Sequence, residues 1–581
     1  MNPTKASAVS TPTISRWAFP GIADDRDIAE LARALAIPRA AARILWNRGY
    51  HDPADAARFL DPRLADLHDP FLLKDMDCAV DRVRHGFPDK IEIHGDYDVD
   101  GVTSTVVLKK ALEMAGATDV SWHIPHRLTD GYGLQPAAVE EAAARGVRLI
   151  VSVDNGIRAD AAIERARELG IDVIVTDHHL PETRLPPALA IINPSRVDCG
   201  YPNKNLCGAG VAFKLAHAIL KGAGWPEARL YRVLESLLKL VAIATVADIV
   251  PLTGENRIIV RHGLNGLIDS RNPGLKALLC ATGFEGKIPS ATEVGFRIAP
   301  AINASGRMES AGQAVRMFLT ADVEEAAAIA AELVALNKER QAAERAIVDE
   351  ILERCLAQPV TDGEAALVFW GEGWHRGVVG IVASRVMQRY HRPAIVLGVE
   401  NGIAQGSGRS IAAFHLLDAL ESMREIFTKF GGHAHAAGLT LPAASLETLR
   451  DRLQSCARER LTLEDMQPCV EIDAVLDLAD IDEDLFKALQ RIAPFGMDNP
   501  RPLFALRGAQ LNGPPQLWKE KHMKLALKQG NRTMVMKGFG MGERVSEWQA
   551  GDSIDAAFEI ERDLYFGGLS VLLRDARHSP A

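Results

Sequence analysis

One eight-residue stretch, 94–101, combines residue types that readily bind a divalent metal ion. It reads His-Gly-Asp-Tyr-Asp-Val-Asp-Gly, so Asp96, Asp98 and Asp100 place three carboxylates within five residues of one another. Because like charges at close range raise each other's pKa, such a group needs a positive partner. Carboxylate oxygens together with the imidazole of His94 suit Mn²⁺ or Mg²⁺. The alternative interpretation is a solvated acidic turn or a calcium-type loop.

The segments around this stretch predict a parallel β-sheet. Between about residues 90 and 195, strand-like and helix-like patterns alternate, which is typical of βαβ units in a doubly wound sheet. The expected strands are Lys90–Ile93, Val120–Ile124, Leu149–Val153, Val173–Val175 and Ala190–Ile192, and the expected helices include Pro136–Arg145 and Ala159–Leu169. Ligand sites in such sheets lie outside the carboxyl ends of the strands.

Two more of these strands end in residues that can bind a metal ion. One is followed by Asp154, and the next is followed by Asp177, His178 and His179. An Asp-Asn-Gly sequence alone is usually a turn, and a lone histidine pair is more often structural. Because three strands deliver such residues to one edge, the pattern predicts a shared metal centre. Asp248, at the end of a long apolar helix, could complete the ligand set, although such a residue is usually just a helix end.

A long helix is expected from Ala321 to Cys355, because alanine and charged residues fill this segment. Asp322 with Glu325 is typical of a capping box. At 1.5 Å per residue the helix would span roughly 50 Å. We interpret it as a connector between two lobes, and a coiled-coil-like interaction helix is the alternative.

A second α/β lobe is expected beyond the connector. Its predicted strands are Ala365–Phe369 and Pro393–Leu397, with a helix at Ile381–Tyr390 between them. Gly377–Gly380 opens that helix, and free backbone N–H groups at a helix N-terminus favour anions.

Three further residues of this lobe strengthen the prediction of an anion site. Arg409 offers a guanidinium suited to bidentate phosphate contact, Ser407 adds a hydroxyl, and His433 follows a glycine pair. Each signal alone is weak, and together they indicate a lobe that holds a phosphate-bearing substrate.

The last part of the chain is predicted to be a small β-barrel. Short alternating strands at Met523–Lys528 and Thr533–Phe539 are separated by glycine-containing turns. Residues 501–540 contain eight Lys/Arg and one Glu, a net charge of +7, whereas the whole chain carries −10. Aromatic residues, Trp518 among them, lie between these charges, as sequence-tolerant binding of single strands requires. The alternative is the solvated face of a strand.

Length and composition limit the number of domains, the cellular location and the cysteine chemistry that we expect. The chain has 581 residues, enough for about three to four domains. No stretch of eighteen apolar residues is present, and the polar N-terminus lacks a signal core, so we expect a cytoplasmic protein with no membrane segment. Seven scattered cysteines without a CxxC pair argue against disulfides and zinc–thiolate sites. The expected domains are a leader with a helical lead-in (1–85), a metal-motif domain (86–315), the connector (316–360), the second lobe (361–462) and the barrel (463–581).

The metal-type motifs of the first domain, in their order along the chain, resemble the four motifs of the DHH phosphoesterase superfamily. The residues that carry the likeness are His94-x-x-x-Asp98-x-Asp100, Asp154-Asn155-Gly156, Asp177-His178-His179 and Ala247-Asp248-x-Val250-Pro251-Leu252. Within the superfamily, the chain is similar to the bacterial single-strand-specific 5′→3′ exonucleases from about residue 70 onward. That closer likeness rests on Ile124–Arg127, Asp130–Leu134, Arg297–Arg307, Gly373–Ile381 and Gly431–Gly438.

The resemblance implies a DHH domain, a DHH-associated domain and a C-terminal OB-fold. It implies a two-metal phosphodiester hydrolase with two Mn²⁺ or Mg²⁺ ions. His94, Asp98 and Asp154 would hold one ion. Asp100, Asp154, His178 and Asp248 would hold the other. His179 would contact the scissile phosphate as electrophile or general acid, while Asp177 orients a histidine and Asp96 lies outside the ligand set.

The resemblance also implies where single-stranded DNA binds. Arg127, Arg307, Ser407 and Arg409 match positions that hold the 5′-terminal phosphate, and Tyr132 matches an aromatic that stacks on a terminal base. The remaining expected DNA contacts are His375, His433, Trp518, Lys519 and Lys521. A role in DNA recombination and repair follows, with a helicase and a single-strand-binding protein as candidate partners.

Two other functions remain as alternatives. A DHH phosphoesterase for short oligonucleotides or other small phosphate substrates would share every metal ligand, but it does not require a basic barrel or a long connector. A non-enzymatic nucleic-acid scaffold would have a degenerate metal site, and none of the superfamily's metal positions is substituted here.

Overall fold

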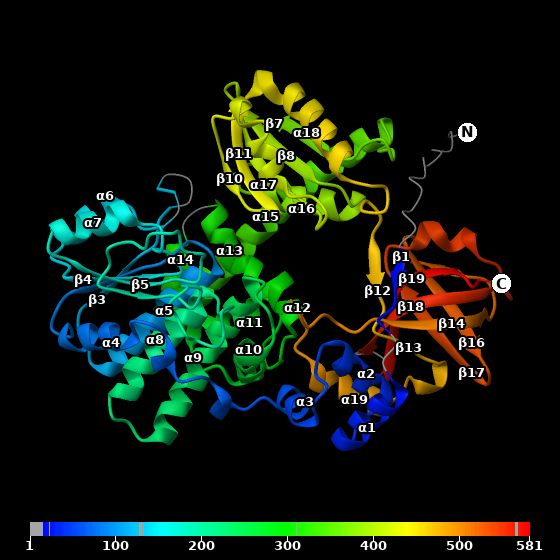
Figure 1. Cartoon of the computed structure of the whole chain (residues 1–581), viewed down its shortest axis with the longest axis horizontal. Coiled ribbons are helices and arrows are strands. Elements are labelled where there is room, and N and C mark those ends of the chain that lie inside the picture. The colour runs from blue at the N-terminus through cyan, green and yellow to red at the C-terminus, as the bar shows by residue number, and fades with distance from the viewer. Residues whose placement is uncertain are drawn as a thin grey trace. The chain divides into compact units, whose positions relative to one another are not determined.

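The computed structural model describes residues 16–21, 24–126, 130–131, 133–308, 311–563 and 567–580. The chain divides into two compact units (Figure 1). The smaller unit comprises Met1–Ala18 with Lys338–Glu471, and the larger unit comprises Phe19–Asn337 with Ile472–Ala581. The expected leader, residues 1–14, lies outside the described residues.

The larger unit contains a five-stranded parallel sheet in the order β3-β2-β4-β5-β6, which confirms the doubly wound prediction. Its strands are β2 (Ile91–His94), β3 (Val120–His123), β4 (Leu149–Val153), β5 (Asp172–Thr176) and β6 (Ala190–Ile192). Its helices are α4 (Met76–His85), α5 (Val99–Ala115), α6 (Pro136–Ala144), α7 (Asp160–Glu168), α8 (Gly208–Gly222), α9 (Glu227–Ala247), α10 (Gly254–Gly266), α11 (Pro273–Ala281), α12 (Ala291–Glu293), the π-helix η4 (Val294–Ile298), α13 (Ala299–Met308) and α14 (Gly312–Leu319).

Alternating side chains divide the sheet into two apolar faces, as the period of two in a β-strand requires. On β4, Leu149 and Val151 join a core shared with α5 and α8, whereas Ile150 joins a core shared with α6 and α7. Figure 1 shows α6 and α7 on one side of the strands and α4 and α8 on the other. All five β4 side chains are buried, which is typical of parallel strands covered on both faces.

The N-terminal helices do not form a separate lead-in. Helices α1 (Asp25–Leu35), α2 (Arg39–Asn47) and α3 (Pro53–Leu60) share one apolar core with α19 (Glu483–Ile492) and the C-terminal barrel. The fully buried Arg257 lies at this junction. Its guanidinium donates to the carbonyls of Phe59, Arg491, Ile492 and Ala493 at 2.6–2.9 Å.

The expected connector is a single helix, α15 (Val323–Ala357), which begins in the larger unit and ends in the smaller one. Asp322 caps it, since its Oδ1 accepts from the backbone N–H groups of Glu324 (2.8 Å) and Glu325 (3.3 Å). The reciprocal half of the predicted capping box is missing, because the Glu325 carboxylate binds Thr320 and Arg316 instead.

The smaller unit holds a mixed five-stranded sheet in the order β10-β11-β9-β8-β7. Its strands are β7 (Leu367–Glu372), β8 (Ala394–Glu400), β9 (Ile403–Arg409), β10 (Lys429–Gly432) and β11 (Ala436–Pro442), and its helices include α16 (Val379–Tyr390), α17 (Leu416–Glu421) and α18 (Leu446–Arg460). The sequence predicted only the parallel pair β7–β8. The segments around Ser407 and Gly431, expected to contribute to an anion site, lie in strands β9 and β10.

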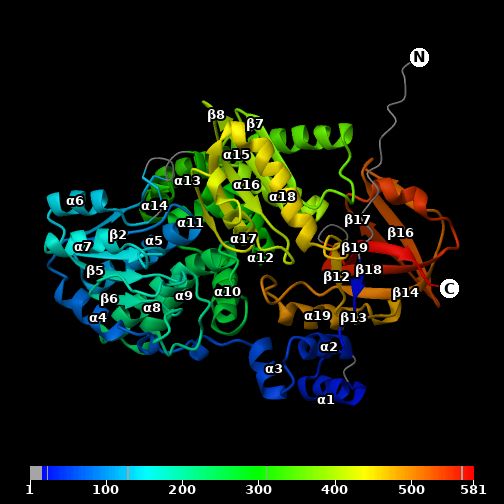
Figure 2. The ribbon, with the colours of Figure 1, turned by 45° about the horizontal axis from the view of Figure 1, so that its top comes forward.

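The C-terminal strands close into a barrel with OB-fold connectivity. Pairings run β14–β16, β16–β17, β17–β19, β19–β18 and β18–β14, and only β17–β19 is parallel. These strands are β14 (Phe504–Leu511), β16 (His522–Gln529), β17 (Arg532–Gly538), β18 (Ser553–Arg562) and β19 (Leu569–His578), with β15 (Gln516–Trp518) in the first connection. Figure 2 shows them together in orange and red. A five-stranded Greek-key barrel of this kind defines the OB-fold.

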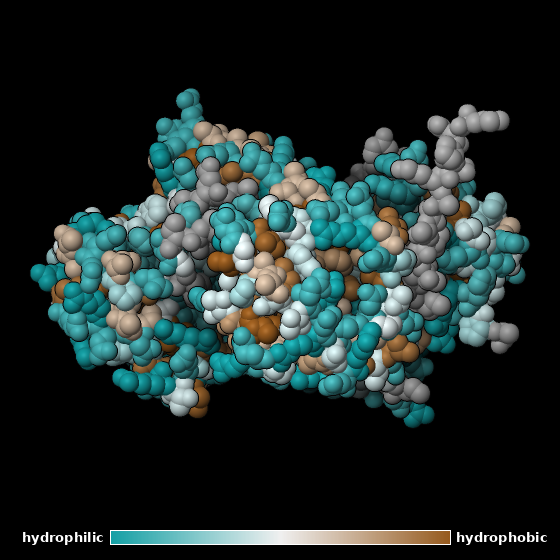
Figure 3. Space-filling view, turned by 90° about the horizontal axis from the view of Figure 1, so that it is seen from above, coloured by the Kyte–Doolittle hydropathy of each residue, from teal (hydrophilic) through white to brown (hydrophobic). Residues whose placement is uncertain are grey.

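No helix among the described residues is long and apolar enough to cross a membrane. On the face shown in Figure 3, hydrophobic residues form small groups between hydrophilic ones.

Candidate metal centre

The candidate site lies where the strand order reverses. The chain passes from β2 to β3 on one side and then returns to β4 on the other side of β2. The carboxyl ends of β2 and β4 therefore flank the switch point, where open α/β sheets bind their ligands. His94 ends β2 and Asp154 directly follows β4, so the predicted strand-end residues lie at this place.

Two helix N-termini hold the acidic residues in position. Asp98 is the N-cap of α5, and its Oδ1 accepts from the backbone of Asp100 (2.9 Å) and Gly101 (3.1 Å). The Asp100 carboxylate accepts from the first amides of α8, Gly208 N (2.6 Å) and Ala209 N (2.7 Å). Free amides and the helix dipole stabilise carboxylates there.

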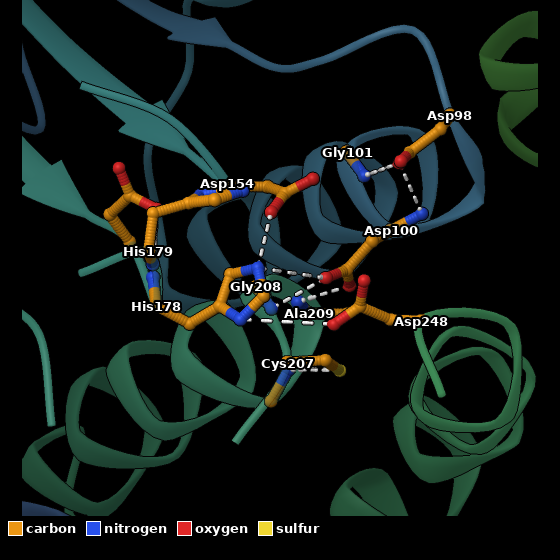
Figure 4. A network of polar contacts seen from close by, with 12 residues as sticks. Asp98, Asp100, Gly101, Asp154, His178, His179, Cys207, Gly208, Ala209 and Asp248 are labelled. Atoms are coloured by element: carbon orange, nitrogen blue, oxygen red, sulfur yellow. Dashed lines mark hydrogen bonds and ion pairs between the residues drawn. The ribbon is translucent and has the colours of Figure 1, made fainter. Parts of the chain in front are cut away.

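His178 is the centre of a carboxylate cluster (Figure 4). Its Nε2 lies 3.2 Å from Asp154 Oδ1 and 3.9 Å from Asp100 Oδ2, and its Nδ1 lies 3.7 Å from Asp248 Oδ2. These four residues come from the ends of β4, β5 and α9 and from the start of α5. The structure thus brings together residues that the sequence separates by about 150 positions, from Asp100 to Asp248.

The protein alone does not neutralise this cluster. Burial and the neighbouring carboxylates raise the pKa of Asp248 to about 8, and the same causes raise the pKa of Asp154 well above its usual value. Burial lowers the pKa of His178, so its imidazole is neutral and has a lone pair available. Carboxylate oxygens with a neutral imidazole and no thiolate ligand are the donor set that Mn²⁺ or Mg²⁺ prefers. The residues present fit divalent cations.

Three groups of described residues place their ligand atoms within 4.8 Å of one another. The groups are Asp96, Asp98 and Asp154; Asp100, His178 and Asp248; and Asp154, His178 and His179. Asp154 belongs to two of them, and its backbone adopts a left-handed φ of 61° at the strand end. A shared carboxylate of this kind can bridge two ions.

The first of these groups has a different membership from the predicted ligand set. His94 belongs to none of the three groups found among the described residues, whereas Asp96 belongs to the first. The Nε2 atom of His94 lies 2.8 Å from Glu92, which also pairs with Arg145 at 2.6 Å. His94 Nε2 is thus bound by an acidic side chain from its own strand, while Asp96 lies within ligand distance of Asp98 and Asp154.

His179 and Asp177 form a separate pair at the edge of the cluster. His179 Nδ1 lies 2.7 Å from Asp177 Oδ1, and the same oxygen accepts from both histidine amides. Although burial alone lowers the pKa of His179, its contact with Asp177 raises that pKa overall. Asp177 is buried and the His179 side chain is 43% exposed. A buried carboxylate therefore orients the imidazole, and part of the ring remains accessible to solvent.

The smaller unit gathers its predicted phosphate-binding residues. A Cβ atom on Gly380, in the first turn of α16, would lie 3.3 Å from Ser407 Oγ and 3.3 Å from an Arg409 nitrogen. The Arg409 guanidinium donates to the Gly408 carbonyl at 2.8 Å, and no carboxylate of the described residues pairs with it. Burial followed by the charges of His435 and Arg409 lowers the pKa of His433, which places these groups together. His375 is exposed and accepts from Gly377 N at 3.1 Å.

The barrel gathers its predicted aromatic residues. The rings of Trp518, His522 and Phe539 lie 5.1–5.7 Å apart, centre to centre. Lys519 and Lys524 place their Nζ atoms 5.1 and 4.8 Å from the Trp518 ring. Lys521 lies on the same exposed turn between β15 and β16. The first long connection and the second strand of an OB-fold are its usual ligand face.

The three remaining residues expected to contact DNA belong to the first lobe. Arg127 and Tyr132 lie outside the described residues, and Arg307 is half-buried near the end of α13.

Sequence reasoning missed the residues that support this centre. Asn303 of α13 accepts from Val99 N at 3.0 Å, and Asn155 donates to the His94 carbonyl at 3.1 Å. The start of α8, Cys207-Gly208-Ala209, was also missed, although a small-residue opening of an apolar helix signals a close approach.

The fold and the site define a DHH phosphoesterase, and three family models match the chain accordingly. They are the DHH family N-terminal domain at residues 90–245, the DHHA1 domain at 362–459 and the RecJ OB domain at 472–574. The chain belongs to the RecJ family.

Curated relatives support this membership across most of the chain. The chain is 36% identical to the single-stranded-DNA-specific exonuclease RecJ of Dickeya dadantii and 35% identical to that of Escherichia coli, covering 94% of this chain and 97% of each relative. It is 42% identical to the RecJ of Bacillus subtilis over 90% of this chain, but spans only 65% of that protein's length.

Comparison with solved structures supports the same family membership. The crystal structure of RecJ from Thermus thermophilus in complex with Mn²⁺ is 31% identical, with a TM-score of 0.83 over 98% of this chain and 80% of that one. A structure of exonuclease RecJ bound to manganese is 35% identical, with a TM-score of 0.59 over 69% of this chain and 100% of that one.

Proposed function

We propose that this protein is a metal-dependent exonuclease that degrades single-stranded DNA from the 5′ end, with a role in recombination and repair. The observation that carries the proposal is the pair of ligand groups that meet at Asp154, at the switch point of a DHH sheet. Relatives that this chain matches over most of its length are named single-stranded-DNA-specific exonucleases.

Two divalent ions would be held by this centre. Asp96, Asp98 and Asp154 would hold one, while Asp100, Asp154, His178 and Asp248 would hold the other. When bound, such ions activate water and neutralise the charge of a phosphodiester. The protein's own contribution is to fix these carboxylates in place, since the amides of α5 and α8 already bind Asp98 and Asp100.

His179 would act on the substrate directly. Asp177 binds its Nδ1 at 2.7 Å, so Nε2 is the ring nitrogen that would contact the substrate. The contact with Asp177 raises the pKa of His179, which favours the protonated ring that would donate to a phosphate oxygen or to the leaving group.

Recognition of the 5′ end would fall to the smaller unit and to three residues of the first lobe. Ser407, Arg409 and the first turn of α16 form an anion site in which guanidinium, hydroxyl and free amides converge. His433 and His375 would add contacts. By family resemblance, Arg127 and Arg307 would also contact the 5′-terminal phosphate, and Tyr132 would stack on the terminal base.

The barrel would hold the rest of the strand. Trp518 offers a stacking platform with Lys519 and Lys521 beside it, and stacking on aromatics is worth about 1–3 kcal/mol per base. A helicase that unwinds duplex and a single-strand-binding protein would be functional partners in the cytoplasm.

The test is digestion of an internally labelled single-stranded oligonucleotide with Mn²⁺ and with EDTA. Free and blocked 5′ ends, a blunt duplex and a dinucleotide complete the set. We expect metal-dependent shortening from the free 5′ end that is absent on the duplex and in the variant Asp154→Ala. The matched control is Glu164→Gln, an exposed acidic position on α7.

The second candidate, a phosphoesterase for small substrates, shares the metal centre. The closed barrel with its aromatic and lysine cluster argues against it, because a dinucleotide needs no such surface. Activity on the dinucleotide alone would favour this alternative.

A further inference from the structure

A cavity of about 460 Å³ lies within the larger unit, away from the residues assigned above. One wall is formed by α10 and residues 284–293, and the other by residues 490–501, which lead from α19 into the barrel. This volume lies in the range of pockets that hold small ligands. None of its lining residues belongs to the metal centre, the proposed phosphate site or the barrel's aromatic cluster.

The lining of this cavity is positively charged. Arg261 and Lys287 contribute cations, and Glu293 is the one carboxylate among the described residues that line it. Arg501 also lines the cavity, but it is already paired with Glu559 and Glu561 at 3.7 and 3.5 Å. Glu293 is already bound in the capping box of α12, where its Oε2 accepts from Ser290 N and Oγ at 2.8 Å. Among the described residues, Arg261 donates to the carbonyls of Gln490 and Ala493, and these contacts do not neutralise its charge. Arg261 and Lys287 therefore favour an anionic ligand.

Apolar and aromatic groups lie among these charges. Phe495 is half-buried in the wall, with the Arg501 guanidinium 5.4 Å from its ring centre, and Ile288 is 51% exposed. Phe296 lies one turn beyond Thr292 on the helix that forms the other wall, and it is 77% exposed. Aromatic faces among cations are what a single strand needs, because every base has a face that can stack.

Both walls lead to the metal centre along the chain. The helix that begins at α12 continues through η4 into α13, whose Asn303 binds the amide of Val99 at 3.0 Å. The ten residues from Glu293 to Asn303 correspond to roughly 15 Å of helix. On the other wall, the Met497 carbonyl accepts from the backbone N–H of Leu252 at 2.9 Å. Leu252 lies four residues after Asp248 in the sequence. The π-helix η4 on this path is an irregularity frequently found at functional sites.

We propose that this cavity and Phe296 bind the single strand on the 3′ side of the scissile bond. A base enters the cavity beside Phe495, Phe296 stacks on a neighbouring base, and Lys287 contacts a phosphate. The inference rests on the proposed exonuclease function and deepens it. It adds a binding site between the point of cleavage and the barrel, and it makes efficient digestion depend on strand length.

The test compares substrates of different length. Full-length Phe296→Ala and Lys287→Gln are assayed with Mn²⁺ on 5′-phosphorylated oligo-dT of 3 to 12 nucleotides. Because one stacked base contributes a factor of about ten or more in affinity, we expect kcat/KM on the 12-mer to fall about tenfold further than on the trimer, through KM. The controls are Val197→Ala, a fully exposed apolar position, and Lys487→Gln on α19.

The outcomes separate the two proposals. Equal activity of variants and wild type at every length overturns the cavity assignment, and so does a loss of the same size at every length. A wild-type protein that degrades no single strand overturns the exonuclease function itself.

Photocrosslinking provides a second measurement on the same chain. Oligonucleotides with 5-iododeoxyuridine at successive positions are irradiated with the wild-type protein in EDTA, and the linked peptides are identified by mass spectrometry. Links from internal positions to residues 284–296 or to Phe495 support the proposal. Links confined to the barrel would overturn it.

Discussion

A Cβ atom on Gly208 would lie 2.5 Å from the carboxylate of Asp154, the residue shared by two ligand groups. The amide of the same glycine donates to Asp100 at 2.6 Å. One position without a side chain thus lets the N-terminus of α8 approach two carboxylates at once. The absence of a side chain there is a requirement of the metal centre.

The variant Gly208→Ala should therefore lose activity although every ligand is retained. The methyl group displaces the Asp154 carboxylate, and we expect metal-dependent hydrolysis to fall at least 100-fold, with Mn²⁺ affinity measured by calorimetry falling as well. The control is Gly200→Ala, where a Cβ meets no atom within 4 Å. Wild-type activity in Gly208→Ala would show that α8 tolerates a shift at this point.

Asp96 and His94 should respond differently to substitution. Because Asp96 lies in a ligand group and His94 is bound to Glu92, Asp96→Asn should weaken Mn²⁺ binding about tenfold or more, whereas His94→Gln should affect it less. Metal titration of both purified variants measures this. The reverse order would restore His94 to the ligand set.

The Glu92 carboxylate should make stability depend on acid pH. Burial alone raises its pKa, but the contacts with His94 and Arg145 lower the pKa to about 2 from 4.5. Because the folded-state pKa is depressed, the stabilisation is complete above pH 4.5 and is lost as pH falls from 4.5 toward 2. A shift of this size corresponds to roughly 3 kcal/mol. We expect Glu92→Gln to unfold at lower urea concentration than wild type at pH 7, with a gap that narrows below pH 4.5. A gap that stays constant with pH would exclude this linkage.

Neutralising Lys519, Lys521 and Lys524 together should flatten the salt dependence of DNA binding. Single-strand binding loses about 0.7 units of log–log slope per phosphate contact, so a loss of up to about 2 units is expected. Fluorescence anisotropy between 50 and 300 mM salt measures the slope, with Lys487→Gln as control. An unchanged slope would place the strand elsewhere than at the Trp518 cluster.

Arg257→Met should destabilise the larger unit. The guanidinium binds four carbonyls and stacks on the Phe59 ring at 3.8 Å. Its removal takes away these four hydrogen bonds, and only the carbonyls of Ile492 and Ala493 keep another side-chain donor among the described residues. We expect a loss of about 3 kcal/mol in the free energy of unfolding, measured by urea denaturation. The control is Lys276→Met, on the exposed side of α11.

The sequence by itself determined which elements form and which residues end them. Alternation of apolar strands and helices fixes the parallel sheet, and parallel strands bring Asp154 and His178 to one edge whatever the details of packing. The concentration of lysines and aromatics around Trp518 likewise indicated a binding barrel, because a local excess of these residue types is visible in the sequence without knowledge of the fold.

Only the tertiary structure decided between neighbouring candidates. Asp96 and His94 are two residues apart, yet Asp96 lies within ligand distance of Asp98 while His94 contacts Glu92, which Arg145, about 50 residues away, also binds. The approach of Gly208 to Asp154, the support from Asn303 and the cavity between α10 and residues 490–501 are contacts between distant segments. Periodicity reports which face of an element is buried, whereas the partner that covers it is set by how helices and strands pack in three dimensions.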